Sequence, residues 1–176
     1  TQGKMQFVVV PDWGGDLKVT YTDGVGDEEI FPDDVHEHVA KGSKTPDFEI
    51  AEGYDGVRKG FSFTGWRDDK GNEWPYDSDK GYAPVAEKVE EEVVYEAQWE
   101  GNLHTITFEN SKGDEIASYE VRFGDTIPLP SGVDVDADDW IDDDGDALPS
   151  DRKLDKDEDL TYTANTGEAY TITWLD

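Results

Sequence analysis

The sequence predicts a mostly-β protein made of two small domains in tandem. Three observations lead to this prediction. Short stretches alternate apolar and polar residues, as strands with one buried face do, and apolar residues at helical spacing are almost absent. The ten residues at 66–75, WRDDKGNEWP, return at 140–149 as WIDDDGDALP. Matching stretches flank both copies in the same order, which indicates that a whole domain is duplicated.

The first repeat is expected at 17–102, after a linker or extra strand at 1–16, the strand being read at 5–10. It begins with the alternating stretch 17–21. One short helix is predicted at 32–39, because Pro32 followed by acidic residues is a good helix start and Gly42 can end it. A G-x-x-x-P turn follows at 42–46, and the strand at 93–99 completes the repeat.

The decapeptide is predicted to be a tight hairpin that carries a core tryptophan. Aspartate favours turns and glycine allows positive φ, so Gly71 and Gly145 mark the two bends. Trp66 and Trp140 are out of phase with the alternation before them, which favours a bulge near Gly65 or Asp139 that turns them inward. The first repeat has inserts on both sides of its tryptophan, and loops absorb such length at small entropic cost.

The second repeat is expected at 103–168, with no helix. Its strands are read at 104–108 and 117–123, a turn at 124–128, and a last strand that includes 162–165. Residues 169–176 are expected to be a closing strand or the start of a truncated third repeat, because 170–174 resemble 104–108.

Composition limits the partners of this chain. It carries 44 acidic and 15 basic residues and a net charge of −29, which disfavours nucleic acid and anionic membranes and predicts a monomer. Cysteine is absent, which excludes disulfides and thiolate chemistry. No apolar run approaches the roughly 20 residues of a membrane span, so no membrane insertion is expected.

The acidic run 134–146 has eight aspartates in thirteen residues and invites a calcium interpretation. An EF-hand loop needs an oxygen ligand at position 1 and glycine at position 6, and placing Gly145 at position 6 puts Trp140 at position 1. No metal site is therefore predicted. A weak, irregular cation site is the alternative to a solvated acidic turn.

No catalytic or cofactor-binding residue is predicted, and the chain is not expected to be an enzyme. The neighbouring carboxylates at 68–69 and 142–143 lie in expected exposed turns, where nothing would desolvate an acid for hydrolysis. His36 and His38 would face different directions on a helix, and His104 has no ligand cluster, so surface histidines are expected. No phosphate-binding loop or nucleophile elbow occurs.

The stretches GFSFTGW at 60–66 and VYEAQWE at 94–100 resemble the Listeria–Bacteroides repeat, also called the internalin B-repeat-like family. The second repeat departs from the pattern, with Asp139 in place of glycine before Trp140 and Asn165-Thr166 in place of the closing Gln-Trp. The resemblance implies small β-grasp, ubiquitin-like repeats in tandem arrays of secreted or wall-anchored Gram-positive proteins. Family members are similar in serving as spacers or adhesion modules.

The function predicted from these observations is a non-enzymatic structural or adhesion module, extracellular at the cell surface or wall. It would act as a stalk or spacer, or present a face to a host or neighbouring surface protein or a glycan. The alternative is a glycan- or cation-binding module that uses exposed aromatics such as Trp13 and the run 134–146. A plain stalk should leave no aromatic side chain exposed in a concave groove.

Overall fold

The computed structural model describes residues 15–26 and 28–165. Its contacts divide the chain into two compact units. The first runs to Gly56 and includes Phe63–Trp99, and the second comprises Val57–Ser62 and the chain from Glu100 onward. Each unit has its own hydrophobic core. The strand predicted at 5–10, Trp13 and the third copy predicted at 170–174 lie outside the described residues.

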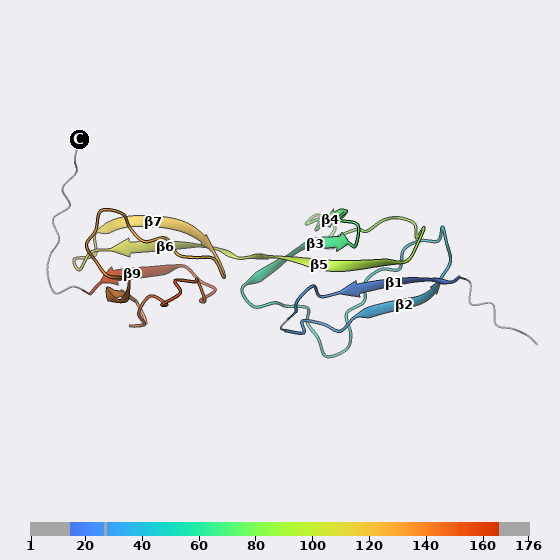
Figure 1. Cartoon of the computed structure of the whole chain (residues 1–176), viewed down its shortest axis with the longest axis horizontal. Coiled ribbons are helices and arrows are strands. Elements are labelled where there is room, and N and C mark those ends of the chain that lie inside the picture. Colours follow the sequence, from blue (N-terminus) through green and yellow to red (C-terminus); the bar gives the residue numbers. More distant parts are fainter. Residues whose placement is uncertain (1–14, 27, 166–176) are drawn as a thin grey trace, which may run out of the picture. The chain divides into compact units, whose positions relative to one another are not determined.

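The first sheet has five strands in the order β2-β1-β5-β3-β4, and Figure 1 labels them. Strands β1 and β5 pair in parallel at its centre, with Tyr21 opposite Tyr95, and β2 pairs antiparallel with β1. The strands are β1 (Leu17–Thr22), β2 (Asp34–Val39), β3 (Phe61–Asp68), β4 (Glu73–Pro75) and β5 (Val93–Gly101).

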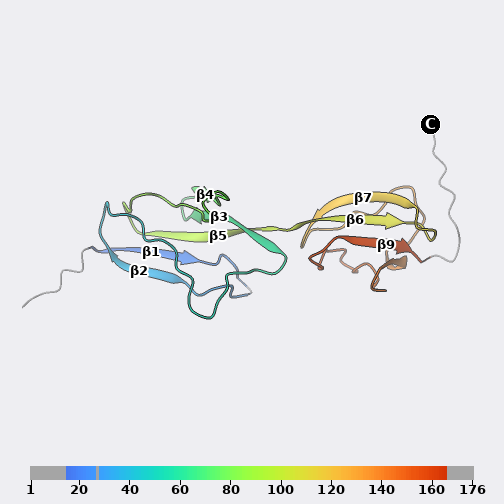
Figure 2. The same ribbon diagram turned by 180° about the vertical axis from the view of Figure 1, so that it is seen from behind.

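The second sheet has four strands in the order β7-β6-β9-β8, and β6, β7 and β9 can also be followed from behind in Figure 2. Its central pair is again parallel, with Phe108 opposite Tyr162. The elements are β6 (Leu103–Glu109), β7 (Glu115–Arg122), a 3₁₀ turn (Ala137–Asp139), β8 (Trp140–Asp142) and β9 (Leu160–Ala164). The order of strands therefore matches β2-β1-β5-β3 of the first sheet.

The two cores repeat one aromatic arrangement. The rings of Tyr21 and Tyr95 stack at 5.1 Å, and those of Phe108 and Tyr162 stack at 5.6 Å. The decapeptide tryptophan meets each stack edge-on, with Trp66 at 4.9 Å from Tyr21 and Trp140 at 4.8 Å from Phe108. Both tryptophans are buried, which confirms the prediction that they are core residues. Aromatic side chains of this size dominate the energetics of a small core.

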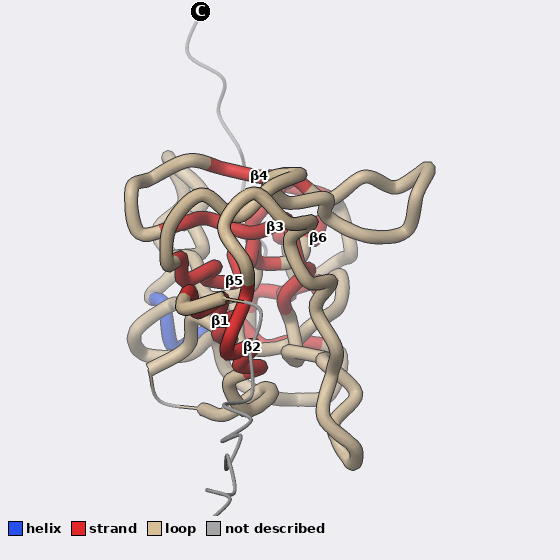
Figure 3. The backbone as a smooth tube through the Cα atoms, turned by 90° about the vertical axis from the view of Figure 1, so that its right-hand side faces the viewer, coloured by secondary structure: helices blue, strands red, loops and turns tan. Residues whose placement is uncertain are grey.

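The predicted helix at 32–39 is wrong, because β2 occupies this segment. Figure 3 shows strands and loops almost throughout, and the described residues contain one short helical turn. The helix signals at Pro32 are local, whereas β1 offers a row of backbone partners that would otherwise form an unprotected sheet edge. The half-buried Asp34 and His36 alternate with the exposed Val35 and Glu37, which fits a strand on the sheet edge.

The tryptophans turn inward by different means in the two repeats. At Gly65 φ is +141°, and a Cβ there would lie 2.2 Å from the Trp74 carbonyl oxygen, so only glycine fits this step of β3. Before Trp140 the chain makes the 3₁₀ turn Ala137–Asp139, where a bulge had been predicted and no helix was expected. The mostly-β class is confirmed, and the finer β-grasp assignment stays a prediction.

Candidate functional site

The duplicated decapeptide forms the same capped hairpin in each unit. Asp142 Oδ1 accepts hydrogen bonds from the backbone N–H of Asp144 at 3.1 Å and Asp146 at 2.8 Å. In the other copy, Asp68 Oδ1 accepts from the backbone N–H of Lys70 and Asn72, at 3.0 and 2.7 Å. The glycine that follows has a φ of +85° at Gly71 and +89° at Gly145, as the turn prediction requires. The shared aspartate thus holds the loop closed.

A third hairpin, between β6 and β7, uses the same device without the tryptophan. Asn110 Oδ1 accepts from the backbone N–H of Lys112 and Asp114, and Gly113 follows with a φ of +82°. The pattern of a capping Asp or Asn followed three residues later by glycine is therefore a general turn of this chain. This supports reading the decapeptide as scaffold.

Three carboxylates of the acidic run converge, and a lysine lies among them. Oxygens of Asp142, Asp144 and Asp146 lie within 4.8 Å of one another, a spacing that suits a cation. Lys156 Nζ donates to all three, at 2.6, 2.9 and 3.1 Å. The described part of the chain brings no other three His, Asp or Glu side chains together in this way. The protein thus supplies the cation for this cluster itself.

Asp142 is buried, so the expectation that these turn acids are all solvated is wrong for it. Burial alone raises the pKa of Asp142, but hydrogen bonds from Lys156 and from the N–H of Asp146 and Asp144 outweigh it and hold the pKa below the ordinary value. The same three carboxylates raise the pKa of Lys156. Lys156 thus favours the charged form of Asp142 although two further carboxylates lie beside it.

The first unit has the same tether, meaning an ion pair between the hairpin loop and a later segment, but with acid and base exchanged. Val89 and Leu154 occupy matching places, since their carbonyls accept from the N–H of Gly42 and Gly124. Glu91 follows Val89 by two residues and pairs with Lys70. Lys156 follows Leu154 by two residues and pairs with Asp144. Lys70 and Asp144 occupy the same position in the two hairpin loops. Both repeats therefore keep an ion pair between the hairpin loop and the segment that follows it, while the positions of the acid and the base are reversed. That is the behaviour of a structural contact.

We expect calcium at about 1 mM to raise the melting temperature of the second unit no more than sodium chloride of equal ionic strength, because Lys156 already fills the triad. Monovalent salt itself should stabilise this unit by screening its acids. Differential scanning calorimetry of the full chain in matched buffers measures both effects. The control is Lys156→Met, in which a calcium-specific rise is expected. A calcium-specific rise of several degrees in the wild type would show that the triad binds metal.

The remaining residues considered for chemistry do not assemble into a catalytic group. His36 Nε2 lies 3.0 Å from Asp34 Oδ2, and His104 Nε2 lies 2.8 Å from Asp157 Oδ1. The His104 side chain is only 14% exposed, so it is less of a surface histidine than predicted. Hydrogen bonds from Asn102 and His104 lower the pKa of Asp157. Asp69 and Asp143, the second acids of each turn, are exposed.

A cavity of about 820 Å³ lies in the first unit, and sequence reasoning had not found it. Its lining comes from the inner strands β1, β3 and β5 and from the two inserts of the first repeat. Nineteen residues separate Pro46 from Trp66, against eleven between Pro128 and Trp140. Thirteen separate Pro75 from Val89, against four between Pro149 and Leu154. The segments that distinguish the first repeat from the second therefore build this cavity.

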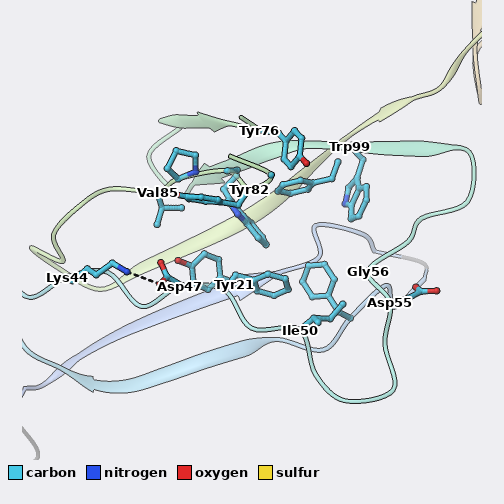
Figure 4. Close-up of a pocket in the computed structure, with 17 residues that line it drawn as sticks. Tyr21, Lys44, Asp47, Ile50, Asp55, Gly56, Tyr76, Tyr82, Val85 and Trp99 are labelled. Carbon is cyan, nitrogen blue, oxygen red and sulfur yellow. Dashed lines mark hydrogen bonds and ion pairs between the residues drawn. The ribbon is translucent and has the colours of Figure 1, made fainter. Parts of the chain in front are cut away.

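Aromatic rings form much of the cavity wall (Figure 4). Trp66 lines the cavity and is in contact with Phe48 and Phe63, each with its ring centroid 5.1 Å from that of Trp66. Tyr76 and Tyr82 stand on the second insert and remain 44% and 54% exposed. The aromatic lining residues are Tyr21, Phe31, Phe48, Phe63, Trp66, Tyr76, Tyr82 and Trp99.

Polar groups are few and lie at the rim. Lys44 Nζ and Asp47 Oδ2 form an ion pair at 2.7 Å, with both side chains 76% exposed. A hydrogen bond from Lys44 to Asp47 raises the pKa of the lysine. Tyr21 donates its hydroxyl to the Pro46 carbonyl at 2.7 Å, and burial raises its pKa. Such a lining, apolar with a few placed polar groups, is typical of small-ligand sites, and so is the volume, since these sites measure about 300–1,000 Å³.

Comparison with known proteins finds few relatives. No family model and no solved structure matches the chain. A protein of Evansella cellulosilytica named "Putative membrane protein" is 28% identical over 75 residues, which is 42% of this chain and 10% of that protein. Another from the same organism, named "Putative Gly-rich membrane protein", is 31% identical over 78 residues, 42% of this chain and 8% of that protein. The chain thus spans a tenth or less of these relatives.

No helix among the described residues has the length and apolar character needed to cross a membrane.

Proposed function

We propose that this chain is a non-enzymatic module of a bacterial cell-surface protein, in which the first repeat binds a ligand in its cavity and the second serves as scaffold and spacer. The observation that carries the proposal is that the two inserts peculiar to the first repeat form the cavity wall. Functional residues concentrate in loops held on a rigid scaffold.

The shared parts of the two repeats support a scaffold role. They consist of the buried tryptophan, the stacked aromatic pair, the capped hairpin and the ion-pair tether, all of which hold the domain together. Inserting loops into such a unit costs little stability, because closure entropy grows slowly with loop length. A duplicated domain is thus free to specialise in one copy.

The surface location rests on three further supports. The resemblance of 60–66 and 94–100 to the Listeria–Bacteroides repeat implies secreted or wall-anchored adhesion and spacer proteins. The two relatives carry names of membrane proteins. A net charge of −29 suits a soluble, self-repelling surface module.

The plain stalk is the second candidate, but it does not account for Tyr76 and Tyr82, which line the cavity and are exposed.

An uncharged solvatochromic dye, Nile red, tests whether this cavity binds ligands in solution. The full chain is expected to bind one dye, with a blue-shifted emission, because the aromatic walls exclude water around it. Tyr82→Ser and Tyr76→Ser should each weaken binding about tenfold, the loss of one aromatic contact.

Tyr54→Ser is the matched control. Tyr54 lies in the first insert, is 39% exposed and does not line the cavity. Its hydroxyl donates to Glu29 Oε1 at the surface. Fluorescence titration of all four proteins gives the comparison. Absence of binding, or equal loss in all three variants, would refute a binding role for the cavity.

A further inference from the structure

We propose that the cavity of the first unit binds an uncharged oligosaccharide, whose rings pack on Tyr76, Tyr82 and Trp99 and whose hydroxyls bond to Lys44 and Asp47. This inference rests on the binding function proposed above and names the ligand class of the same site.

The exposed rings suit the apolar faces of sugars. Tyr76 and Tyr82 present a large part of their surface to solvent at the cavity. An aromatic ring has a negative face, and the C–H groups on one side of a pyranose carry partial positive charge, so the two surfaces attract when stacked. The rings of Tyr76 and Trp99 both pack against Phe63, with centroids 6.1 and 5.7 Å from its ring, so the two belong to the same part of the cavity lining. Adjacent ring platforms of this kind suit linked sugar units.

The Lys44–Asp47 pair suits sugar hydroxyls. A hydroxyl both donates and accepts a hydrogen bond, and this pair offers ammonium donors next to carboxylate acceptors. Since both side chains are 76% exposed, each keeps donors or acceptors facing solvent after pairing with the other. Figure 4 shows this pair at the opposite side of the cavity from Asp55.

Charge argues for an uncharged ligand. The charged residues of the lining are Lys44, Asp47 and Asp55. One cation already paired with an acid cannot balance an acidic polysaccharide against a chain of net charge −29. A cationic ligand would be attracted by the chain as a whole but would meet Lys44 at the rim. The lining itself carries a formal charge of only −1, from one lysine and two aspartates.

The cavity does not suit the capture of a peptide by strand addition. Strand addition needs a sheet edge, and the edges here are β2 and β4, neither of which lines the cavity. The strand residues of the lining come from β1, β3 and β5, which are all inner strands. Trp99 donates its indole N–H to the Asp23 carbonyl at 2.7 Å and so presents only its ring to a ligand.

The test is isothermal titration of the full chain with neutral oligosaccharides: tetramers of α- and β-linked glucose, of mannose, of galactose and of N-acetylglucosamine. At least one is expected to bind. Tyr82→Ser and Tyr76→Ser should each weaken that binding about tenfold, and Tyr54→Ser should leave it unchanged. Lys44→Met with Asp47→Leu, which removes the polar pair, should weaken sugar binding but not Nile red binding. Far-ultraviolet circular dichroism checks that every variant is folded.

Nile red separates the failure of this inference from that of the proposed function, and three further ligands test the ligand class: a heparin tetrasaccharide, a chitosan tetramer and a proline-rich peptide. If Nile red binds but none of the neutral sugars does, the ligand class is wrong and the binding function stands. Binding of one of these three in preference to every neutral sugar would also overturn the ligand class. If neither dye nor sugar binds, both proposals fail.

Discussion

Trp140→Ala is expected to lower the free energy of unfolding of the second unit by about 3–5 kcal/mol, the range for truncating a buried large aromatic. A domain has only about 5–15 kcal/mol in total. Trp140 is 1% exposed and packs edge-on against Phe108, so its loss leaves a void in the centre of the core. Because each unit has its own core, the first unit should stay folded in this variant.

Chemical unfolding followed by circular dichroism and by amide hydrogen exchange measures the loss and assigns it to one unit. Trp66→Ala should do the same to the first unit and should also abolish dye binding, because Trp66 lines the cavity as well as the core. The matched control is Leu103→Ala, at a position 49% exposed, which should change stability by less than about 0.5 kcal/mol. A cost below about 1 kcal/mol at either tryptophan would show that the decapeptide does not serve the core.

The parts of the fold that the sequence predicts well are those with a local signal. The alternation at 93–99 places Tyr95 and Ala97 inward, and both are 2% exposed. The capped hairpins follow from an Asp or Asn and a Gly at fixed spacing, since the side chain and the φ angle act within the loop itself. These features need no knowledge of the rest of the chain.

The helix predicted at 32–39 failed because its signals were local but the deciding interaction was not. A proline followed by acids favours a helix start only while no strand competes for the backbone. The partner here, β1, lies well before the segment in sequence, with Tyr21 opposite Asp34 and Thr20 opposite Val35. Tertiary pairing therefore outweighed local propensity.

The candidate site was missed for a different reason. The two inserts have no periodicity, so they were read only as extra loop length, and their aromatic residues Phe48, Tyr76 and Tyr82 were not connected. A usable signal was present nevertheless: inserts in one copy of a duplicated domain, each carrying aromatic residues. Lys156 was missed because it lies ten or more residues beyond the carboxylates it contacts. Alignment of Glu91 with Lys156 and of Lys70 with Asp144 would have suggested the exchanged ion pair.

The second large effect on stability is expected at Asp142, whose buried carboxylate closes the hairpin and contacts Lys156. Asp142→Ala is expected to cost about 1–3 kcal/mol, because the N–H groups of Asp144 and Asp146 lose their acceptor next to the core. Asp68→Ala is the matched variant in the first unit. It should cost less, since Asp68 is only half-buried and water can replace its carboxylate.

The pH dependence separates the charge of Asp142 from its role as acceptor. Its pKa in the folded protein is below the ordinary value of about 3.9, because hydrogen bonds from Lys156 and the loop N–H groups outweigh the opposing effect of burial. The folded state therefore binds this proton more weakly than the unfolded state does. The resulting stabilisation is fully present above pH of about 4 and is lost as the pH falls through the lower, folded pKa.

Asp142→Asn keeps an oxygen for the loop N–H groups but carries no charge, so it lacks this titration. Urea unfolding of the wild type and Asp142→Asn, between neutral pH and the acid limit of the folded state, measures the difference. The wild type should be the more stable at neutral pH, and its advantage should shrink as the solution becomes acidic. Asp143→Asn, at the exposed neighbour, should show no such convergence beyond the general effect of removing one acid. A wild-type advantage that stays constant into acid would mean that the Asp142 charge and its contact with Lys156 contribute nothing to folding.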